Sequence, residues 1–218
     1  MTDILIRASS IGKIMTEPRS KSEGILSKGA KTYLRGLARQ MILGIDDVVS
    51  SKYIEKGNEC EPESIALLNR VLGTSMAKNT ERRTKHGITG ECDLFNLMAS
   101  WGHDIKTSWS SATWPAFVAD AEDPLYEWQA RAYTMLWDSS GWEVDYCLLD
   151  TPERLIGYED FSMHTVGHIP EHMRVTRWII PRDMDKERLM IEKVEAAQEY
   201  LAEVIREFDE THKELEIA

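Results

Sequence analysis

The stretch Gly90-Glu91-Cys92-Asp93-Leu94, followed closely by Asp104-Ile105-Lys106, decides how this chain folds. The sequence around it predicts two strands, 84–95 and 101–107, joined by a short connection. Residues two apart on a strand point to the same face, so Asp104 and Lys106 project together while Ile105 faces the core. A hairpin would bring Asp93 beside them. We therefore expect two carboxylates and a lysine on one face of a central hairpin.

Helical and strand patterns surround this hairpin on both sides of the sequence. Helices are expected over 9–15, 26–43, 58–72, 126–137 and 183–208, and further strands over 142–150 and 174–180. The polar, breaker-rich residues 17–24 predict a basic loop. A length of 218 residues without an internal repeat favours a single domain, 1–218. The expected fold class is α/β (α+β), a central mixed β-sheet flanked by helices.

The composition excludes several classes of protein. Hydrophobic residues make up 42% of the chain and charged residues 29%, which is typical of a globular domain. No run approaches the roughly 18 apolar residues of a membrane span, and a signal-peptide pattern is missing at Met1, so neither membrane nor secretion is expected. Three scattered cysteines, Cys60, Cys92 and Cys147, cannot form a disulfide framework or a four-thiolate iron–sulfur site. A reducing cytoplasm is the expected location.

Charge is distributed unevenly along the chain. The 26 basic and 37 acidic residues give a formal net charge of −11, which by itself argues against a polyanionic partner. Residues 1–56, however, contain ten basic and six acidic residues, and 78–85 add a second basic cluster. A polyanion could therefore meet one basic face while the acidic 183–218 region repels it. Ordinary solvated helix faces explain the same pattern equally well.

Two carboxylates beside a lysine suit the hydrolysis of a phosphodiester. Asp93 and Asp104 are ligands of the kind that Mg²⁺ prefers, and the backbone carbonyl of Ile105 offers a further oxygen. A metal neutralises charge developing on the phosphate, and Lys106 can position or activate water. Two ions, if both bind, would lie roughly 3.5–4 Å apart. The Asp-Ile-Lys tripeptide alone also fits a surface ion pair on a partly exposed strand.

Further motifs occur in a recognisable order around this tripeptide. They are Lys56-Gly57-Asn58-Glu59-Cys60-Glu61-Pro62, then Asp93, Asp104-Ile105-Lys106 and Tyr126-Glu127-Trp128-Gln129. Together they resemble the phage lambda exonuclease and YqaJ viral recombinase family of the PD-(D/E)XK nuclease superfamily. The N-terminal segments 7–11 and 18–20 are similar to that family as well. The resemblance implies a restriction-endonuclease-like PD-(D/E)XK core.

The resemblance also implies roles for individual residues. Asp93, Asp104 and the Ile105 carbonyl would bind metal, Lys106 would be the catalytic lysine, and Glu61 would be a further metal-site or water-orienting acid. The remaining site residues follow from the same motifs: Gln129 beside the active centre, Ser9 with Ser10 near the DNA end and its 5′-phosphate, and Arg7 and Arg19 as weaker phosphate contacts. The cofactor would be Mg²⁺, with Mn²⁺ as a substitute.

The function implied is digestion of one strand of linear double-stranded DNA, 5′ to 3′, which leaves a 3′ overhang for phage-type homologous recombination. Relatives form rings around DNA, so a toroidal homotrimer and a single-strand annealing protein are the expected partners. The setting would be the cytoplasm of a bacterial host, with a phage or prophage as the source of the gene.

Two departures from the family pattern leave alternatives open. Cys92 and Leu94 flank Asp93 where many relatives have Pro-Asp-Gly, and Arg131 replaces a second glutamine found in some relatives. No residue of this chain clearly matches the family's phosphate-clamping arginine, so dependence on a 5′-phosphate stays open. The rival functions are a PD-(D/E)XK endonuclease that cuts internal sites and a catalytically silent DNA-end-binding module.

Histidine and tryptophan patterns invite two further hypotheses. His164, His168 and His172 recur every four residues, but Gly167 and Pro170 would break the helix that a zinc site needs. Trp109, together with Trp114, lies in the polar stretch after Lys106 and is a candidate for stacking on DNA. Core packing is the commoner use of tryptophan at this density.

Overall fold

The structure is a computed structural model that describes residues 4–46 and 50–216. Its central element is a four-stranded mixed sheet. Its strand order is β4-β5-β6-β7, in which the β5–β6 pair is parallel and the other two pairs are antiparallel. A second, three-stranded sheet has the order β1-β3-β2. The strands are β1 (Ile6–Arg7), β2 (Arg82–Lys85), β3 (Ile88–Glu91), β4 (Leu94–Asn96), β5 (Trp101–Thr107), β6 (Gly141–Cys147) and β7 (Val175–Pro181). The expected mixed α/β class is confirmed.

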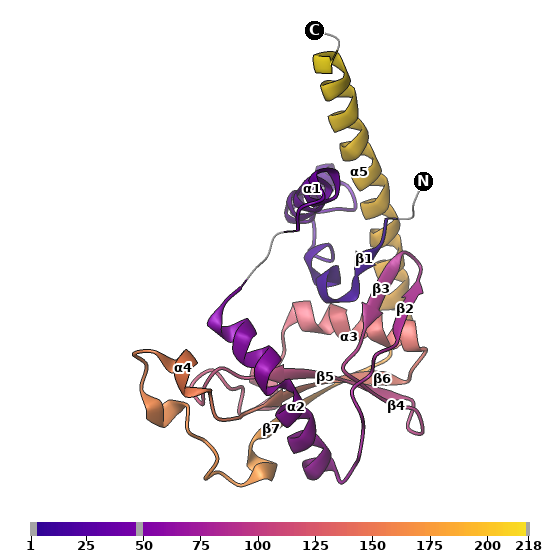
Figure 1. Cartoon of the computed structure of the whole chain (residues 1–218). Coiled ribbons are helices and arrows are strands. Elements are labelled where there is room, and N and C mark those ends of the chain that lie inside the picture. The colour runs from indigo at the N-terminus through magenta and orange to yellow at the C-terminus, as the bar shows by residue number, and fades with distance from the viewer. Residues whose placement is uncertain (1–3, 47–49, 217–218) are drawn as a thin grey trace.

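Helices cover the four-stranded sheet from both sides (Figure 1). The helices are α1 (Lys28–Leu43), α2 (Lys52–Leu72), α3 (Pro124–Trp137), α4 (Glu153–Ile156) and α5 (Met184–Glu216), together with the short 3-10 helices η1 (Ala8–Lys13), η2 (Lys21–Glu23), η3 (Val118–Asp120), η4 (Phe161–Met163) and η5 (Glu171–Met173). Within these described residues, none of the helices combines the length and apolar character needed to cross a membrane.

Two apolar clusters hold these layers together. On one face of the sheet, Ala130 and Trp137 of α3 pack with Trp142 and Val144 of β6, and α1 and α5 extend this cluster. On the other face, Leu67 and Leu68 of α2 pack against Ile105 and Cys147. Alternation along β5 and β6 sends neighbouring side chains into different clusters. The catalytic candidates of β5 therefore lie on the α3 face.

Several expected elements differ in extent from the observed ones, three of them most clearly. The predicted strand 84–95 is three strands, because His86 and Gly87 adopt positive φ values of 50° and 73° and turn β2 back into β3. Helix α2 begins six residues before the predicted 58, with the Ser51 side chain accepting a hydrogen bond from the Ile54 N–H. Helix α5 continues to 216 instead of 208.

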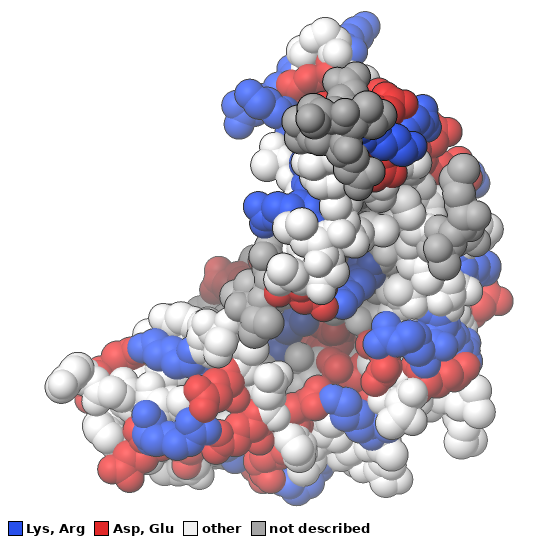
Figure 2. Space-filling view, turned by 45° about the horizontal axis from the view of Figure 1, so that its top comes forward, with Lys and Arg blue, Asp and Glu red and all other residues white. Residues whose placement is uncertain are grey.

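The expected single domain, 1–218, includes residues 1–3, 47–49 and 217–218, which lie outside the described part. Figure 2 shows one face of the molecule, where blue basic and red acidic groups alternate around a central hollow. The basic residues visible on this face do not merge into one continuous patch.

Candidate active site

Strand β5 supplies a carboxylate and a lysine that contact each other. Asp104 and Lys106 lie on one face of β5, and Lys106 Nζ is 2.6 Å from Asp104 Oδ2. Asp104 is only 3% exposed. Burial alone lowers the pKa of Lys106, but the charge of Asp104 and a hydrogen bond to it outweigh burial and raise the pKa above its usual value. Lys106 is therefore held as an ammonium group beside Asp104.

Asp93 lies next to this pair through strand register. Leu94 pairs with His103 across β4 and β5, which places Asp93 beside Asp104. The Ile105 backbone N–H donates a hydrogen bond of 2.7 Å to Asp93 Oδ2. Burial, followed by the charge of Asp104, raises the pKa of Asp93 to about 7. Two carboxylates held side by side in this way form an arrangement that a divalent cation would stabilise.

Helices α3 and α2 close the site from two directions. Gln129 of α3 donates a hydrogen bond of 3.0 Å from Nε2 to Asp104 Oδ1, so Lys106 and Gln129 hold opposite oxygens of one carboxylate. Glu61 projects from α2 and forms an ion pair with Lys78. Helix α3, which carries Gln129, begins directly after Asp123. The Asp123 side chain caps the helix by accepting a hydrogen bond from the Leu125 N–H.

These side chains line one pocket of about 550 Å³. Its wall is formed by side chains from segments that are far apart in the sequence: Glu61, Asp93, Asp104, Lys106 and Gln129. Ile105, whose backbone carbonyl is the further metal-ligand candidate, also lines the pocket. The structure therefore brings together every metal-site and catalytic candidate that the sequence predicted.

Three tyrosines that were not among the predicted site residues complete the same pocket. The ring of Tyr126 lies 4.4 Å from Lys106 Nζ, which is a cation–π distance. Tyr133 follows Gln129 by one helical turn, and Tyr146 pairs with Lys106 in the β5–β6 register. The four-residue helical spacing could have identified Tyr133. Tyr146 required knowledge of the register.

The N-terminal DNA-binding candidates lie in two separate places. Arg7 and Ser9 line a neighbouring cavity of about 360 Å³, which shares Tyr133 with the main pocket. Ser10 follows on η1. Arg19 lies in a different cavity, beside the N-terminus of α1. The structure brings Arg7 and Ser9, but not Arg19, next to the active-site pocket.

Trp109 lines the pocket with little of its surface. It is 8% exposed, and its indole N–H donates to Glu159 at 2.9 Å. Its ring meets Tyr53 and His164 edge-on, with centroid distances of 5.0 Å and 5.1 Å. Stacking of Trp109 on DNA stays a prediction that would require this packing to open.

The histidine series of the sequence does not assemble. His164 is buried and contacts Thr151 Oγ1 at 2.9 Å through Nδ1 and Glu159 at 3.2 Å through Nε2. His168 and His172 are exposed on the segment that contains η4 and η5, and no helix aligns the three.

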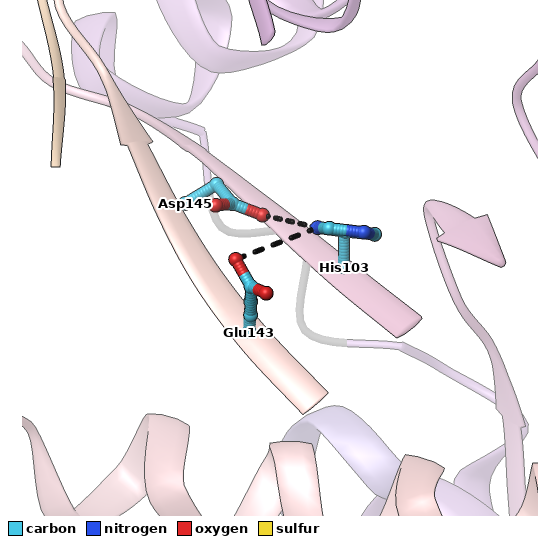
Figure 3. A group of neighbouring side chains, drawn as sticks. All are labelled: His103, Glu143 and Asp145. Atoms are coloured by element: carbon cyan, nitrogen blue, oxygen red, sulfur yellow. Dashed lines mark hydrogen bonds and ion pairs between the residues drawn. The ribbon is translucent and has the colours of Figure 1, made fainter. Parts of the chain in front are cut away.

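A second group of titratable side chains lies on the other face of the sheet. Glu143 and Asp145 of β6 point toward the imidazole of His103 on β5 (Figure 3). His103 Nδ1 is 2.9 Å from Asp145 Oδ2, and Arg177 donates to both oxygens of Glu143 at 2.8 Å and 2.9 Å. The Arg177 guanidinium thus supplies the positive charge that a bound metal ion would otherwise bring to this group. His103 faces away from Asp104, because neighbouring residues of a strand point to opposite faces, and its contact with Asp145 is structural.

Comparisons with known proteins agree with this geometry. The chain is similar to a solved structure of a phage-related exonuclease from Haemophilus somnus 129PT, with 35% identity and a TM-score of 0.89 over 94% of this chain and 97% of that one. It also resembles an alkaline exonuclease from Laribacter hongkongensis, with 17% identity and a TM-score of 0.68 over 98% and 95% of the two chains. A complex of that enzyme with dAMP has 18% identity and a TM-score of 0.63, over 99% and 96%. No protein-family model and no curated protein matches the chain.

The fold and the pocket define a nuclease of the PD-(D/E)XK class. More narrowly, the chain belongs to the family of phage-related exonucleases of the lambda exonuclease and YqaJ type. The family resemblance read from the sequence is thereby confirmed.

Proposed function

We propose that this nuclease is a divalent-metal-dependent exonuclease that digests one strand of linear double-stranded DNA, 5′ to 3′, from its end. The observation that carries the proposal is the single pocket that collects Glu61, Asp93, Asp104, Lys106 and Gln129. The product would carry a 3′ single-stranded overhang, the substrate for homologous recombination.

Asp93, Asp104 and the Ile105 carbonyl would hold Mg²⁺ or Mn²⁺, as two ions with Glu61 at the second. The fit rests on the donor set, since two adjacent carboxylates, the buried Asp104 and the half-buried Asp93, offer the oxygen ligands that these cations prefer. Burial, and then the charge of Asp104, raise the pKa of Asp93, and a bound cation would relieve both effects. A bound cation would neutralise charge that develops on the scissile phosphate and lower the pKa of a bound water.

The chain's own residues orient the reactants. Lys106, held by Asp104 and the Tyr126 ring, would direct its N–H groups at the attacking water or the phosphate. Gln129 would keep the Asp104 carboxylate in one orientation. Glu61 would exchange its ion pair with Lys78 for a role as a metal or water ligand.

Binding of the DNA end would use the cavity beside this pocket. Ser9 and Arg7 line it, and Ser10 follows on the same short helix, so a 5′-phosphate placed there would lie next to the catalytic carboxylates. Arg19, in its separate cavity, would contact DNA farther from the cleavage site. Each subunit would be a single domain, 1–218, and three subunits would form a toroidal homotrimer. A single-strand annealing protein would be its partner. The protein would act in the cytoplasm of a bacterial host, and its gene would come from a phage or prophage.

The test compares linear with covalently closed duplex DNA in Mg²⁺ and in EDTA, with 5′-labelled ends that carry or lack a phosphate. Digestion of linear DNA only, with early release of the 5′ label and none in EDTA, is the expected result. Cutting of the closed circle would favour the endonuclease instead. Binding of ends without any cleavage would favour the silent module.

A further inference from the structure

Lys56 is a lysine with no exposed surface, one and a half turns before Glu61 on α2. Burial of an ammonium group is costly unless every N–H finds an acceptor. The side chain crosses from α2 toward the ends of the two parallel strands, where it meets backbone oxygens from both.

Four oxygens surround Lys56 Nζ. They are the backbone carbonyls of Ser108 at 2.7 Å, Trp109 at 2.9 Å and Leu149 at 2.9 Å, and the hydroxyl of Thr151 at 2.8 Å. An ammonium group has three N–H donors, so these acceptors exceed its donors. Loss of the lysine would leave three buried carbonyls without this donor.

The positions of these acceptors give the contact its significance. Ser108 and Trp109 come directly after the end of β5, the strand that carries Lys106, and Leu149 lies just beyond the end of β6. Lys56 therefore ties the helix that carries Glu61 to the strand that carries Lys106. The Thr151 hydroxyl reinforces the tie, since it also donates to the Trp109 carbonyl at 2.9 Å.

We propose that Lys56 is a positioning residue, whose bonds beyond β5 and β6 set the separation of Glu61 from Lys106 and Asp104. This inference rests on the proposed function, because it assumes that those residues perform the cleavage. Burial lowers the pKa of Lys56 to about 8, because the ammonium group has been removed from water.

A second buried lysine provides a matched control. Lys193 of α5 is 2% exposed, and its Nζ donates at 3.1 Å to the carbonyls of Met15 and Thr16 and to the Glu17 carboxylate. It resembles Lys56 in burial and in its use of carbonyl acceptors. None of its acceptors lines the active-site pocket, so its removal tests stability without the proposed positioning effect.

The experiment compares Lys56→Met with Lys193→Met in the full chain. We expect both to lower the midpoint of thermal unfolding, and only Lys56→Met to lower kcat on linear duplex DNA, by about 10- to 100-fold with KM changed less than about threefold. Assays are run below both midpoints. An unchanged kcat in Lys56→Met, or an equal loss in Lys193→Met, would overturn the proposal.

A double-mutant cycle tests the route through the helix glutamate. If Lys56 acts by placing Glu61, the loss in kcat for Lys56→Met combined with Glu61→Gln is smaller than the product of the two single losses. Multiplicative losses within about twofold would contradict the proposal. If Lys56→Met does not fold, Thr151→Val replaces it, and we expect a loss in kcat of the same kind but of smaller size.

Lys106→Ala distinguishes a failure of the proposed function from a failure of the positioning role. If Lys106→Ala retains cleavage, the proposed function of the pocket fails and the positioning role fails with it. If Lys106→Ala is inactive while Lys56→Met cleaves normally, only the positioning role is lost.

Discussion

The backbone N–H of Ile105 donates a hydrogen bond of 2.7 Å to the carboxylate of Asp93. This bond fastens a residue that precedes β4 to the strand that carries Asp104 and Lys106. It holds two acids together despite their like charge, and it partly offsets the burial that raises the pKa of Asp93 to about 7. The arrangement stores an electrostatic cost at the place where we propose that a cation binds.

Replacement of Asp93 should abolish function and stabilise the metal-free protein. The pKa of Asp93 rises from 3.8 to about 7 in the folded state, so folded protein binds this proton more tightly, and stability falls as pH rises between these values. Asp93→Asn removes that cost, by about 1–3 kcal/mol near pH 8 and much less near pH 4. Urea unfolding in EDTA at both pH values measures it. A variant less stable than wild type near pH 8 would contradict this account.

Metal activation should weaken as the pH falls below about 7. Metal binding requires the ionised carboxylate, so protons compete with Mg²⁺ for Asp93 as its pKa is passed. The half-saturating Mg²⁺ concentration should rise up to about tenfold per pH unit, and added Mg²⁺ should restore the rate. Cleavage titrations near pH 6 and pH 8, at constant ionic strength, check this. A lower maximal rate with an unshifted Mg²⁺ midpoint would speak against it.

Lys106→Ala should lower the cleavage rate by about 10²- to 10⁴-fold. The ammonium group contacts Asp104 at 2.6 Å inside the pocket, so its removal takes away charge where the phosphate would lie. Single-turnover digestion of linear duplex measures the effect. Lys186→Ala is the control, because that lysine pairs with Glu127 outside the pocket at 2.5 Å and should retain activity.

Arg177→Met should destabilise the protein by about 3–5 kcal/mol, because Glu143 and Asp145 would be left buried without their guanidinium partner. Partial exposure of Arg177 places the effect toward the lower end of that range. Denaturant unfolding measures it, with the exposed Arg188→Met as a control that should stay near wild type. The interpretation of His103, Glu143, Asp145 and Arg177 as an ion network would be wrong if the wild-type protein bound one equivalent of zinc at this group in place of Arg177.

Much of the architecture followed from local patterns. The alternation of 101–107 predicted β5 with its observed bounds, and it predicted that Asp104 and Lys106 share a face while Ile105 turns toward the core. Helical spacing predicted α1 to within two residues at its start and α3 to within two. These predictions succeed because strand and helix periods are set by neighbouring residues of the chain. The ordered motifs, in turn, predicted Glu61 and Gln129 as members of the site.

Other features depended on contacts between distant segments. The division of 84–95 into three strands, the placement of Tyr146 opposite Lys106 and the use of Arg177 against Glu143 all depend on strand register. The burial of Lys56 depends on α2 covering the ends of β5 and β6. Local sequence patterns set which faces of the strands and helices carry chemistry. Which of those faces meet depends on tertiary packing, because register and helix docking are selected by long-range contacts that no local period encodes.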